Sequence, residues 1–394
     1  MKSSKTSMDL LLDIKNISIE GYSDEIWHPI IKGVNLQLSR GEVLGLIGES
    51  GAGKSTLGLA AMGFVRTGCR FTGGSILFDG KDLTKLSERE KQKLWGTKFS
   101  YVAQSAAAAF NPAHRLINQT IEASLSHKLN EKEILQKEAI QLYKEMQLPD
   151  PNEIGERYPH QVSGGQLQRT MTAMAMSSKP DLIIFDEPTT ALDVTTQVNV
   201  LETIRSIVKE HQTAAIYITH DLAVVAQMAD RIQVLRYGDT IEVAKTTQML
   251  KSPKEEYTKS LWAVRSIKKK EQKSTVEILR VKNVNASYGS GPNVLQDINI
   301  NVPTGRTVAI VGESGSGKST IARAITGLLP PKQGKIFFKE RILPKKLSER
   351  SKEDLRRIQM IYQSPDTSMN PRHTVREIIG RPLSFYHGID GIKN

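Results

Sequence analysis

The chain carries the same nine-residue loop twice, and this loop requires a specific local fold. GESGAGKST occupies residues 48–56 and GESGSGKST occupies residues 312–320, and the two differ at one position. The first loop follows the apolar run EVLGLI and precedes a helical pattern that begins at Lys54. This is the strand–loop–helix context that a phosphate-binding loop needs. The sequence therefore predicts a phosphate-binding loop at each of the two places.

The residue types in the loop indicate its chemistry. Glycines let backbone N–H groups curl around phosphate oxygens, and the N-terminus of the following helix adds positive potential. Lys54 can reach the β- and γ-phosphates, and Ser55 can bind magnesium; Lys318 and Ser319 stand at the same positions in the second loop. The candidate nucleotide-binding residues are Gly48, Glu49, Ser50, Gly51, Ala52, Gly53, Lys54, Ser55 and Thr56 in the first loop, and Gly312, Gly315, Gly317, Lys318, Ser319 and Thr320 in the second.

Two carboxylates follow another apolar run. The segment DLIIFDEP at 181–188 is typical of a buried strand and ends in Asp186 and Glu187. Asp186 is placed to hold a magnesium ion, and Glu187 suits the polarisation of the attacking water. Taken alone, the pair could be solvated acidic residues at a strand end. The phosphate loop elsewhere in the chain favours the magnesium site.

Two more predicted strands end in polar side chains. The segment 214–221, AAIYITHD, places His220 at the ligand-facing edge of a parallel sheet. A contact with the γ-phosphate is the sharper interpretation, and a structural histidine the plainer one. The segment 98–104, KFSYVAQ, ends in Gln104, which could touch magnesium or water; Gln363 is its counterpart in the second copy.

A Ser-Gly-Gly turn forms a fourth element. VSGGQLQR at 162–169 opens a predicted helix, within a segment of mainly helical character at about 116–178. Such a turn is rich in N–H donors and suits an anion. Because one nucleotide needs only one such cradle per face, a second cradle indicates use by a neighbouring subunit. Its candidate residues are Ser163, Gly164, Gly165 and Gln166.

The repetition extends well beyond the loop. LDIKNI at 12–17 matches LRVKNV at 279–284, and Asn-Pro follows each of the two glutamines at the same distance. We therefore expect one complete domain and one half domain, joined by a charged linker. Their predicted limits are 8–264 for the complete domain, 265–275 for the linker and 276–394 for the N-terminal half of the second domain.

Composition narrows the class of protein. No apolar run approaches the roughly 20 residues that cross a bilayer, and the single cysteine, Cys69, excludes an internal disulfide. Residues 1–264 carry 30 basic and 31 acidic side chains, whereas residues 265–394 carry 24 and 11. This asymmetry indicates either a nucleic-acid or membrane surface or the unbalanced charge of an incomplete domain.

Together these motifs carry a family resemblance. GESGAGKS, YVAQS, VSGGQLQR, LIIFDEP, ALD and ITHD, in this order, resemble an ABC-type ATPase domain. The resemblance implies an α/β fold of the P-loop NTPase type, with a RecA-like core, an antiparallel β subdomain and a helical subdomain, in tandem with the second copy incomplete. The tail SPKEEYTKSLW at 252–262 is similar to the dipeptide, oligopeptide and nickel importer subfamily, of which some members fuse two ATPase domains, as for glutathione or microcin-type peptides.

The resemblance implies two ATP molecules with magnesium, sandwiched between two domains packed head to tail. Each ATP then contacts one domain through the phosphate loop and its neighbouring side chains, and the other domain through the Ser-Gly-Gly turn. Asp193 crosses the interface. The residues that act in cis are Lys54, Ser55, Gln104, Asp186, Glu187 and His220. An upstream aromatic stacks on adenine, with Tyr288 fitting in the second copy and Tyr22 or Trp27 in the first. The implied partners are two permease subunits docked near Gln104, an extracytoplasmic solute-binding protein and another ABC ATPase domain, at the cytoplasmic face of the plasma membrane. We expect no nucleic-acid partner.

The second copy lacks the signature turn, both carboxylates and the histidine. We therefore expect neither site to be complete within one chain, negligible ATPase activity from a monomer, and a need for a second complete domain in trans. We also expect unpaired apolar edges in the second copy, as in a truncated, frame-shifted or fragmentary product. The leading functional hypothesis is the ATP-hydrolysing subunit of an importer for peptides or similar small solutes. The alternatives are a soluble tandem ATPase acting on ribosomes or DNA, and a non-catalytic remnant.

Overall fold

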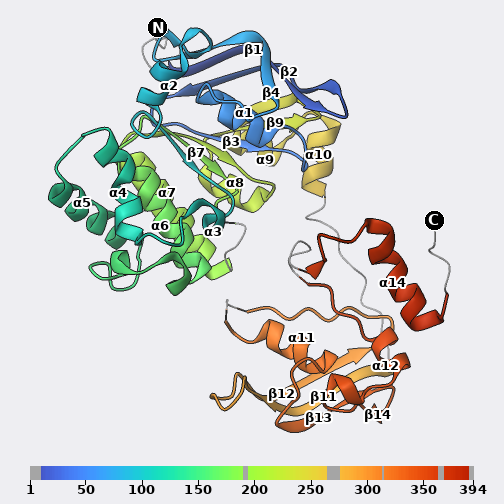
Figure 1. Ribbon diagram of the computed structural model, residues 1–394. Helices are drawn as coiled ribbons and strands as arrows, with labels where there is room; N and C mark the ends of the chain where they lie inside the picture. The colour runs from blue at the N-terminus through green and yellow to red at the C-terminus, as the bar shows by residue number, and fades with distance from the viewer. Residues whose placement is uncertain (1–9, 190–193, 264–275, 313–314, 363–367, 390–394) are drawn as a thin grey trace. The chain divides into compact units, whose positions relative to one another are not determined.

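The chain forms two compact units, residues 1–268 and 269–394 (Figure 1). The computed structural model describes residues 10–189, 194–263, 276–312, 315–362 and 368–389. The predicted linker at 265–275 lies outside the described residues, and the predicted domain limits stay a prediction. Each unit is described by itself below.

An antiparallel sheet opens unit 1, in the order β2-β1-β4-β5. Ile14 on the central strand pairs with Leu36 on one side and with Ile76 on the other, and all three side chains are buried. One face of this sheet therefore contributes to the core. The strands are β1 (Leu10–Ser23), β2 (Ile26–Ser39), β4 (Cys69–Phe78) and β5 (Lys81–Asp82).

A six-stranded sheet forms the centre of unit 1, in the order β10-β9-β3-β8-β7-β6. All its neighbouring pairs are parallel except β10 and β9. The strands are β3 (Val43–Ile47), β6 (Phe99–Val102), β7 (Leu182–Asp186), β8 (Ala214–Ile218), β9 (Arg231–Arg236) and β10 (Asp239–Lys245). The strand predictions at 42–48, 98–104, 181–188 and 214–221 are confirmed. Their carboxyl ends lie at one edge of the sheet.

Both faces of the central sheet are covered, so its strands read as continuous apolar runs. Leu182 and Ile184 of β7 belong to a core cluster shared with β1, β2 and the helix after the phosphate loop. Ile183 and Phe185, which alternate with them, belong to a second cluster shared with later helices. Because successive side chains of a strand point to opposite faces of the sheet, β7 contributes to two separate cores.

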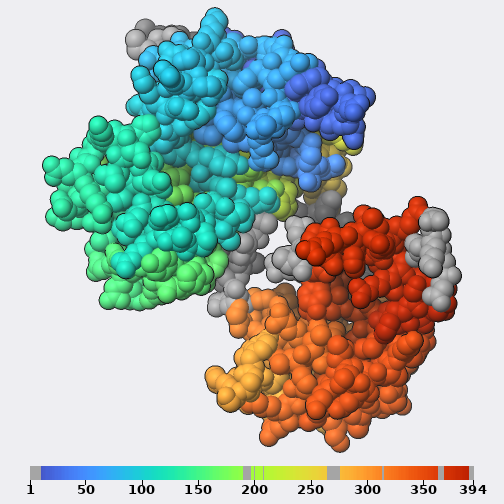
Figure 2. Space-filling view, in the orientation of Figure 1, coloured from blue at the N-terminus to red at the C-terminus, as the bar shows by residue number. Residues whose placement is uncertain are grey.

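Helices surround this sheet, and a group of them forms a separate part of unit 1 (Figures 1 and 2). The helices α4, α5 and α6 contact one another, and a buried hydrogen bond of 2.6 Å joins Thr120 to Tyr143 inside the group. The mainly helical character predicted for about 116–178 is confirmed. No helix among the described residues is long and apolar enough to cross a membrane. The helices are α1 (Lys54–Ala61), α2 (Glu88–Leu94), α3 (Ala106–Ala109), α4 (Leu116–Ser126), α5 (Lys132–Glu145), α6 (Gly164–Met176), α7 (Val194–Glu210), α8 (Leu222–Met228), α9 (Thr246–Lys251) and α10 (Glu256–Ala263).

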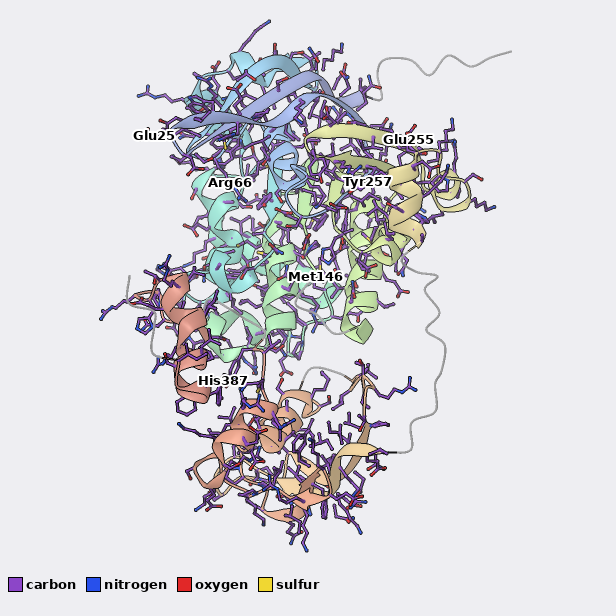
Figure 3. All side chains as sticks on the ribbon, turned by 90° about the vertical axis from the view of Figure 1, so that its right-hand side faces the viewer. Glu25, Arg66, Met146, Glu255, Tyr257 and His387 are labelled. Atoms are coloured by element: carbon purple, nitrogen blue, oxygen red, sulfur yellow. The ribbon has the colours of Figure 1, made fainter. Side chains whose placement is uncertain are left out.

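The tail of unit 1 is fixed to the edge strand β10. Glu242 on β10 is buried, and its carboxylate accepts the N–H groups of Lys254 and Glu255 at 3.0 and 3.1 Å. Figure 3 labels Glu255 and Tyr257 at the start of α10. A charged side chain thus sets where the last helix begins.

Unit 2 repeats the first elements of unit 1 in the same order. Its sheet has the order β12-β11-β13-β14. Among the described residues, however, 307–312 and 358–362 form no strand, although they correspond to β3 and β6. Val311 and Ile361 are 87% and 96% exposed there. The elements are β11 (Glu277–Ala286), β12 (Leu295–Pro303), α11 (Lys318–Thr326), β13 (Gln333–Phe338), β14 (Arg341–Ile342), α12 (Lys352–Arg357) and α14 (Val375–His387).

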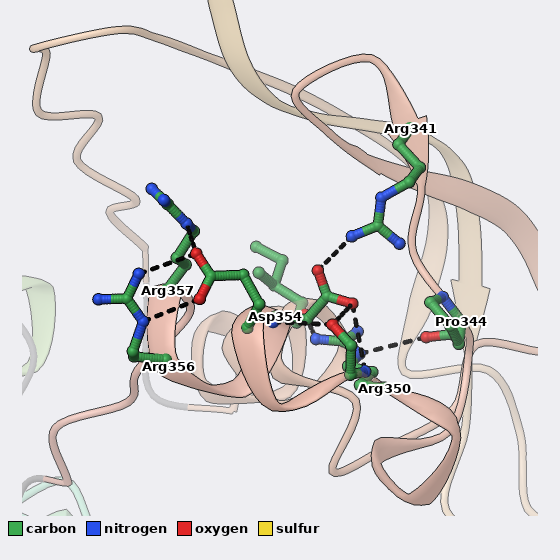
Figure 4. Close-up of polar contacts among 9 residues, drawn as sticks. Arg341, Pro344, Arg350, Asp354, Arg356 and Arg357 are labelled. Carbon is green, nitrogen blue, oxygen red and sulfur yellow. Dashed lines mark hydrogen bonds and ion pairs between the residues drawn. The ribbon is translucent and has the colours of Figure 1, made fainter. Parts of the chain in front are cut away.

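Many basic side chains of unit 2 serve its own structure (Figure 4). Asp354 forms a capping box with Ser351 at the start of α12 and pairs with Arg341 of β14. Arg350 donates to the carbonyl oxygens of Pro344 and Ile325 at 3.2 and 2.7 Å. These arginines hold α12 to neighbouring segments.

Candidate active site

The first phosphate loop joins β3 to α1 and depends on glycine at its two ends. Gly48 has φ 150, and a Cβ there would lie 2.1 Å from the carbonyl oxygen of Leu235 in β9. Gly53 has φ 95 and caps α1, and a Cβ there would lie 2.6 Å from Ile31 Cδ1. Only glycine fits either position. The glycines let the backbone curl between them; within that curl the N–H of Ala52 bonds to the carbonyl oxygen of Glu49 at 3.1 Å.

Lys54 lies buried at the start of α1 and points back along the loop. Its Nζ donates to the carbonyl oxygens of Gly48 and Glu49, both at 2.8 Å. Burial lowers the pKa of Lys54, while the nearby carboxylates of Glu187 and Asp186 partly oppose that shift. The ammonium group is thus held by neutral carbonyls, which a phosphate can replace with a stronger, charge-assisted contact.

Asp186 is joined to the loop by Ser55. Ser55 Oγ donates to Asp186 Oδ1 at 2.9 Å, and the carboxyl end of β7 places this carboxylate beside α1. Hydroxyl and carboxylate oxygens are the donors that magnesium prefers, and magnesium usually takes few protein ligands together with water and phosphate oxygens. The pair therefore fits a magnesium ion. Among the described residues there is no cluster of three or more His, Cys, Asp and Glu side chains that would form a metal site of another kind.

Tyr101 is a site residue that the sequence interpretation missed. Its hydroxyl donates to Asp186 Oδ2 at 2.6 Å, so both oxygens of this carboxylate are engaged. Burial raises the pKa of Tyr101 well above its usual range, and the hydrogen bond to Asp186 raises it further. Tyr101 lies in YVAQS, three residues before Gln104. The sequence did carry a signal for this contact. The strands predicted at 98–104 and 181–188 both end in candidate site residues, so they could be expected to pair in parallel and bring Tyr101 near Asp186.

Glu187 is the centre of a second polar cluster. Gln104 Nε2 donates to its Oε2 at 3.1 Å, and His220 Nδ1 lies 3.0 Å from its Oε1. The backbone of Glu187 has φ 50, a left-handed conformation that costs a residue with a side chain about 1–3 kcal/mol. Its N–H is bonded to the carbonyl oxygen of Ile218 in β8 at 2.9 Å, which holds that conformation. The three predicted catalytic side chains therefore meet at the carboxyl edge of the sheet.

The signature turn opens α6. Ser163 Oγ accepts the N–H of Gln166 at 3.3 Å, and Gln166 Oε1 accepts the N–H of Ser163 at 2.9 Å. This reciprocal capping box satisfies the N–H groups of Ser163 and Gln166, and those of Gly164 and Gly165 have no acceptor within the helix. Ser163 and Gly164 are exposed, and a Cβ on Gly164 would meet nothing within 4 Å. Ser163, Gly164, Gly165 and Gln166 thus form an open turn that another molecule can approach.

A buried glutamine connects α6 with the candidate catalytic cluster, formed by Gln104, Glu187 and His220. Gln168 is 2% exposed, and its Nε2 donates at 3.4 Å to the carbonyl oxygen of Ala103, the residue before Gln104. This residue belongs to VSGGQLQR, but its contact joins positions 65 residues apart and could not be read from the motif. The hydrogen bond connects α6 to the chain that carries Gln104.

The candidate adenine-stacking residues lie outside the catalytic cluster. Tyr22 and Trp27 face each other across β1 and β2 with ring centroids 5.2 Å apart, and Arg70 lies 4.0 Å above the Trp27 ring. The choice between Tyr22 and Trp27 stays open. Asp193 and Gln363 lie outside the described residues.

The second phosphate loop repeats part of this geometry. Gly312, Gly315 and Gly317 have φ 152, 86 and 95, close to the angles of the first loop. Lys318 Nζ donates to the carbonyl oxygen of Gly312 at 2.8 Å. Tyr288 lies beside the loop, since its hydroxyl is 3.4 Å from Thr320 Oγ1 and accepts Arg323 Nη1 at 2.8 Å.

Ser319 follows Lys318 at the start of α11, as Ser55 follows Lys54 in α1. Within the described part of unit 2, no strand corresponds to β7, the strand that carries Asp186 in unit 1. The two loops are therefore alike in backbone and unlike in surroundings.

An apolar groove in unit 1 is lined in part by Tyr101, the residue that bonds to Asp186. It encloses a cavity of about 560 Å³ between the sheet edge and the helical group. Phe64 and Trp95 form one wall with an edge-to-face contact of 5.6 Å, and Tyr101 forms part of another. The groove therefore shares Tyr101 with the contact to Asp186.

Comparisons with known proteins agree with this architecture. The sequence matches the protein family described as ABC transporter over residues 31–190 and 295–390. The glutathione import ATP-binding protein GsiA of Escherichia coli (strain K12) is 32% identical in a match of length 428 that includes 96% of this chain and 68% of that protein. The same protein of Salmonella typhimurium (strain LT2) is 32% identical over 424 residues, with the same shares.

Solved structures give the same fold. The dimeric, post-hydrolysis state of the ATP-binding cassette MJ0796 bound to ADP and Pi is 25% identical, with a TM-score of 0.55, and the match covers 60% of this chain and 99% of that one. The cbiO1 protein of Clostridium perfringens, part of the complex cbiONQ, is 23% identical with a TM-score of 0.54, covering 66% and 94%. The predicted fold class is confirmed.

Proposed function

This chain belongs to the ABC transporter family, and we propose that it is the subunit that hydrolyses ATP to drive the import of peptides or similar small solutes. The observation that carries the proposal is the meeting of Gln104, Glu187 and His220 beside the Lys54 loop. The importer role is supported by relatives named for glutathione import that align with 96% of the chain. ABC cassettes bind and hydrolyse ATP.

Unit 1 carries the residues for phosphate binding and for water activation. Backbone amides of residues 50–56 and the Lys54 ammonium bind the β- and γ-phosphates, and Ser55 and Asp186 hold magnesium. When bound, the magnesium ion neutralises charge on the phosphate oxygens. Glu187 orients the attacking water and receives its proton; this role is supported by the proximity of its carboxylate to Lys54, the residue that reaches the γ-phosphate. Gln104 and His220 hold the Glu187 carboxylate in position relative to the γ-phosphate.

Complete sites require a second ATPase domain. We assign residues 8–264 as the complete domain, 265–275 as a linker and 276–394 as part of a second domain. Ser163, Gly164, Gly165 and Gln166 of one domain then face the ATP held by Lys54 of another, and Asp193 crosses between them. The exposed, capped turn at Gly164 supports this arrangement, since its N–H groups are open to solvent. In the second loop, Gln363 and Tyr288 take the places of Gln104 and the adenine-stacking aromatic.

The apolar groove suits a permease. Two membrane permease subunits dock on a pair of ATPase domains, each inserting an apolar helix face between Phe64, Trp95 and Tyr101. An amphipathic helix can lay its apolar face into a groove lined by apolar side chains. The chain then works as a peripheral protein at the cytoplasmic face of the plasma membrane, together with an extracytoplasmic solute-binding protein. No nucleic-acid partner is required.

A soluble ATPase on ribosomes or DNA is the second candidate, favoured by the basic residues 265–394. Part of that charge is occupied within unit 2, because Glu353 pairs with Arg356 and Arg357, and Asp354 pairs with Arg341. Paired arginines attract phosphate less strongly than free ones. The importer proposal therefore stands ahead of this one.

Two measurements test the proposal. ATP turnover by the purified chain should rise with the square of its concentration, and appreciable turnover by a proven monomer would contradict the need for a second domain. In cells that naturally produce this protein, replacement of the parent protein by the Glu187→Gln variant should lower the uptake of radiolabelled glutathione and of a labelled tripeptide. The surface change Glu210→Gln is the matched control.

A third experiment addresses the second candidate. Co-sedimentation of the chain with ribosomes that is abolished by RNase, together with unchanged solute uptake, would favour the ribosome-associated ATPase.

A further inference from the structure

The last helix of unit 1 contacts the phosphate loop. Tyr257 of α10 is half-buried, and its hydroxyl oxygen accepts the backbone N–H of Glu49 at 3.3 Å. The two residues are 208 positions apart. The tail SPKEEYTKSLW at 252–262 therefore reaches the first phosphate loop.

The Glu49 peptide is held from two sides. Its N–H is bonded to Tyr257, and its carbonyl oxygen accepts Lys54 Nζ at 2.8 Å. The ammonium of Lys54 has three N–H donors, so it can turn toward a phosphate oxygen and its bond to this carbonyl can change when ATP binds. The bond from Tyr257 involves no group that contacts a phosphate, so it can stay in place.

The helix that carries Tyr257 is firmly placed. The carboxylate of Glu242 fixes its start through the N–H groups of Lys254 and Glu255. Tyr257, Leu261 and Trp262, at positions i, i+4 and i+5, pack against the core. The guanidinium of Arg236 lies 4.5 Å above the Tyr257 ring, at a distance typical of a cation–π contact. Tyr257 therefore has little freedom to leave the loop.

The same helix also faces the hydrolytic side of the site. Leu261, one turn after Tyr257, lines a cavity of about 420 Å³ together with Gly48, Glu49 and His220. The tail thus contacts the loop that holds the phosphates and borders the space next to the histidine. Its position suits an element that controls the loop's shape.

We propose that Tyr257 is a positioning residue that holds the Glu49 peptide, and with it the phosphate loop, in the shape that receives ATP. The inference rests on the proposed role of this loop as the ATP site. A loop that is already ordered binds with less loss of conformational entropy than one that must be ordered by its ligand. The tail helix therefore sets the affinity of the Lys54 site for ATP.

Calorimetric titration of ATP with Mg²⁺ into the full chain tests this. All proteins carry Lys318→Ala, so that binding reports on the Lys54 loop. Tyr257→Phe keeps the ring and removes the acceptor oxygen, and we expect it to weaken ATP binding about three- to tenfold, as the loss of one hydrogen bond implies. Tyr237→Phe is the matched control, because Tyr237 stacks on the same Arg236 at 5.1 Å and is exposed. Equal ATP affinity in the Tyr257→Phe and Tyr237→Phe proteins would overturn the inference.

Hydrogen exchange without nucleotide gives the second readout. In Tyr257→Phe the peptide that contains Glu49 should exchange faster, while α10 keeps its protection. Loss of protection across α10 itself would overturn a role for the hydroxyl group, since it would mean that helix packing had failed. If the parent chain binds no ATP, the proposed function fails, and the exchange of the Glu49 peptide still decides whether Tyr257 holds the loop.

Discussion

The hydroxyl group of Tyr101 donates a 2.6 Å hydrogen bond to Oδ2 of Asp186, the carboxylate whose other oxygen accepts Ser55 Oγ at 2.9 Å. The ring of Tyr101 forms part of the apolar groove that we assign to a permease. Tyr101 therefore borders the proposed docking surface and also holds the carboxylate of Asp186, which we propose as a magnesium ligand. A shift of the ring would change the geometry at Asp186.

Tyr101→Phe should weaken magnesium binding. The change leaves the ring in the groove and frees one oxygen of Asp186. We expect the Mg²⁺ concentration for half-maximal tightening of ATP binding to rise about tenfold, equivalent to ~1.4 kcal/mol. ATP affinity measured in EDTA is the internal control and should stay the same. An unchanged Mg²⁺ requirement would show that the Tyr101 hydroxyl does not position Asp186.

Glu187→Gln should separate ATP binding from turnover. Glutamine keeps hydrogen-bonding capacity toward Gln104 and His220 but cannot take a proton from water. Turnover should fall about 100-fold or more, the usual contribution of a general base, while ATP affinity changes little. Steady-state hydrolysis and equilibrium ATP binding measured on the same preparation check this. Turnover within tenfold of the parent value would exclude Glu187 as the base.

The sequence predicted those features whose causes are local. The apolar runs at 43–47, 182–186 and 214–218 are buried strands because each has the composition and length of a strand covered on both faces. Their order along the chain also placed Gln104, Glu187 and His220 at the ends of strands, and the parallel sheet brings those ends together.

Contacts between distant segments could not be predicted in this way. Tyr101 meets Asp186 because β6 pairs with β7 in one particular register, and Tyr257 meets Glu49 because Glu242 fixes the start of α10. The apolar segment 307–311 resembles β3, yet the described residues 307–312 form no strand. A central parallel strand needs hydrogen-bonding neighbours on both sides, and sequence likeness alone does not supply them.

Ser163→Ala should affect both stability and turnover. Loss of the cap on α6 should cost about 1 kcal/mol of unfolding free energy, and loss of an ordered donor turn should lower turnover tenfold or more if that turn serves the ATP of another domain. Ser87→Ala removes an equivalent capping box at α2. The Ser87→Ala control should lower the unfolding free energy by a similar amount without lowering ATP turnover. Thermal unfolding and ATPase rates of the two variants decide the point, and equal turnover in both would remove the signature role from Ser163.

Glu242 should make the stability of unit 1 depend on acid pH. Burial alone would raise the pKa of Glu242, but the N–H groups of Lys254 and Glu255, together with the Thr258 hydroxyl and the charge of Lys254, lower it below its usual value of 4.5. A carboxyl whose pKa is lowered by folding stabilises the folded state above the unfolded pKa, and that stabilisation is lost as the pH falls through the folded pKa. The melting temperature of the parent chain should therefore fall more steeply below about pH 4.5 than that of Glu242→Gln, and the two curves should converge. Glu255→Gln, which removes an exposed acid from the same tail, should run parallel to the parent. Parallel curves for the parent and Glu242→Gln would mean that this carboxylate does not anchor α10.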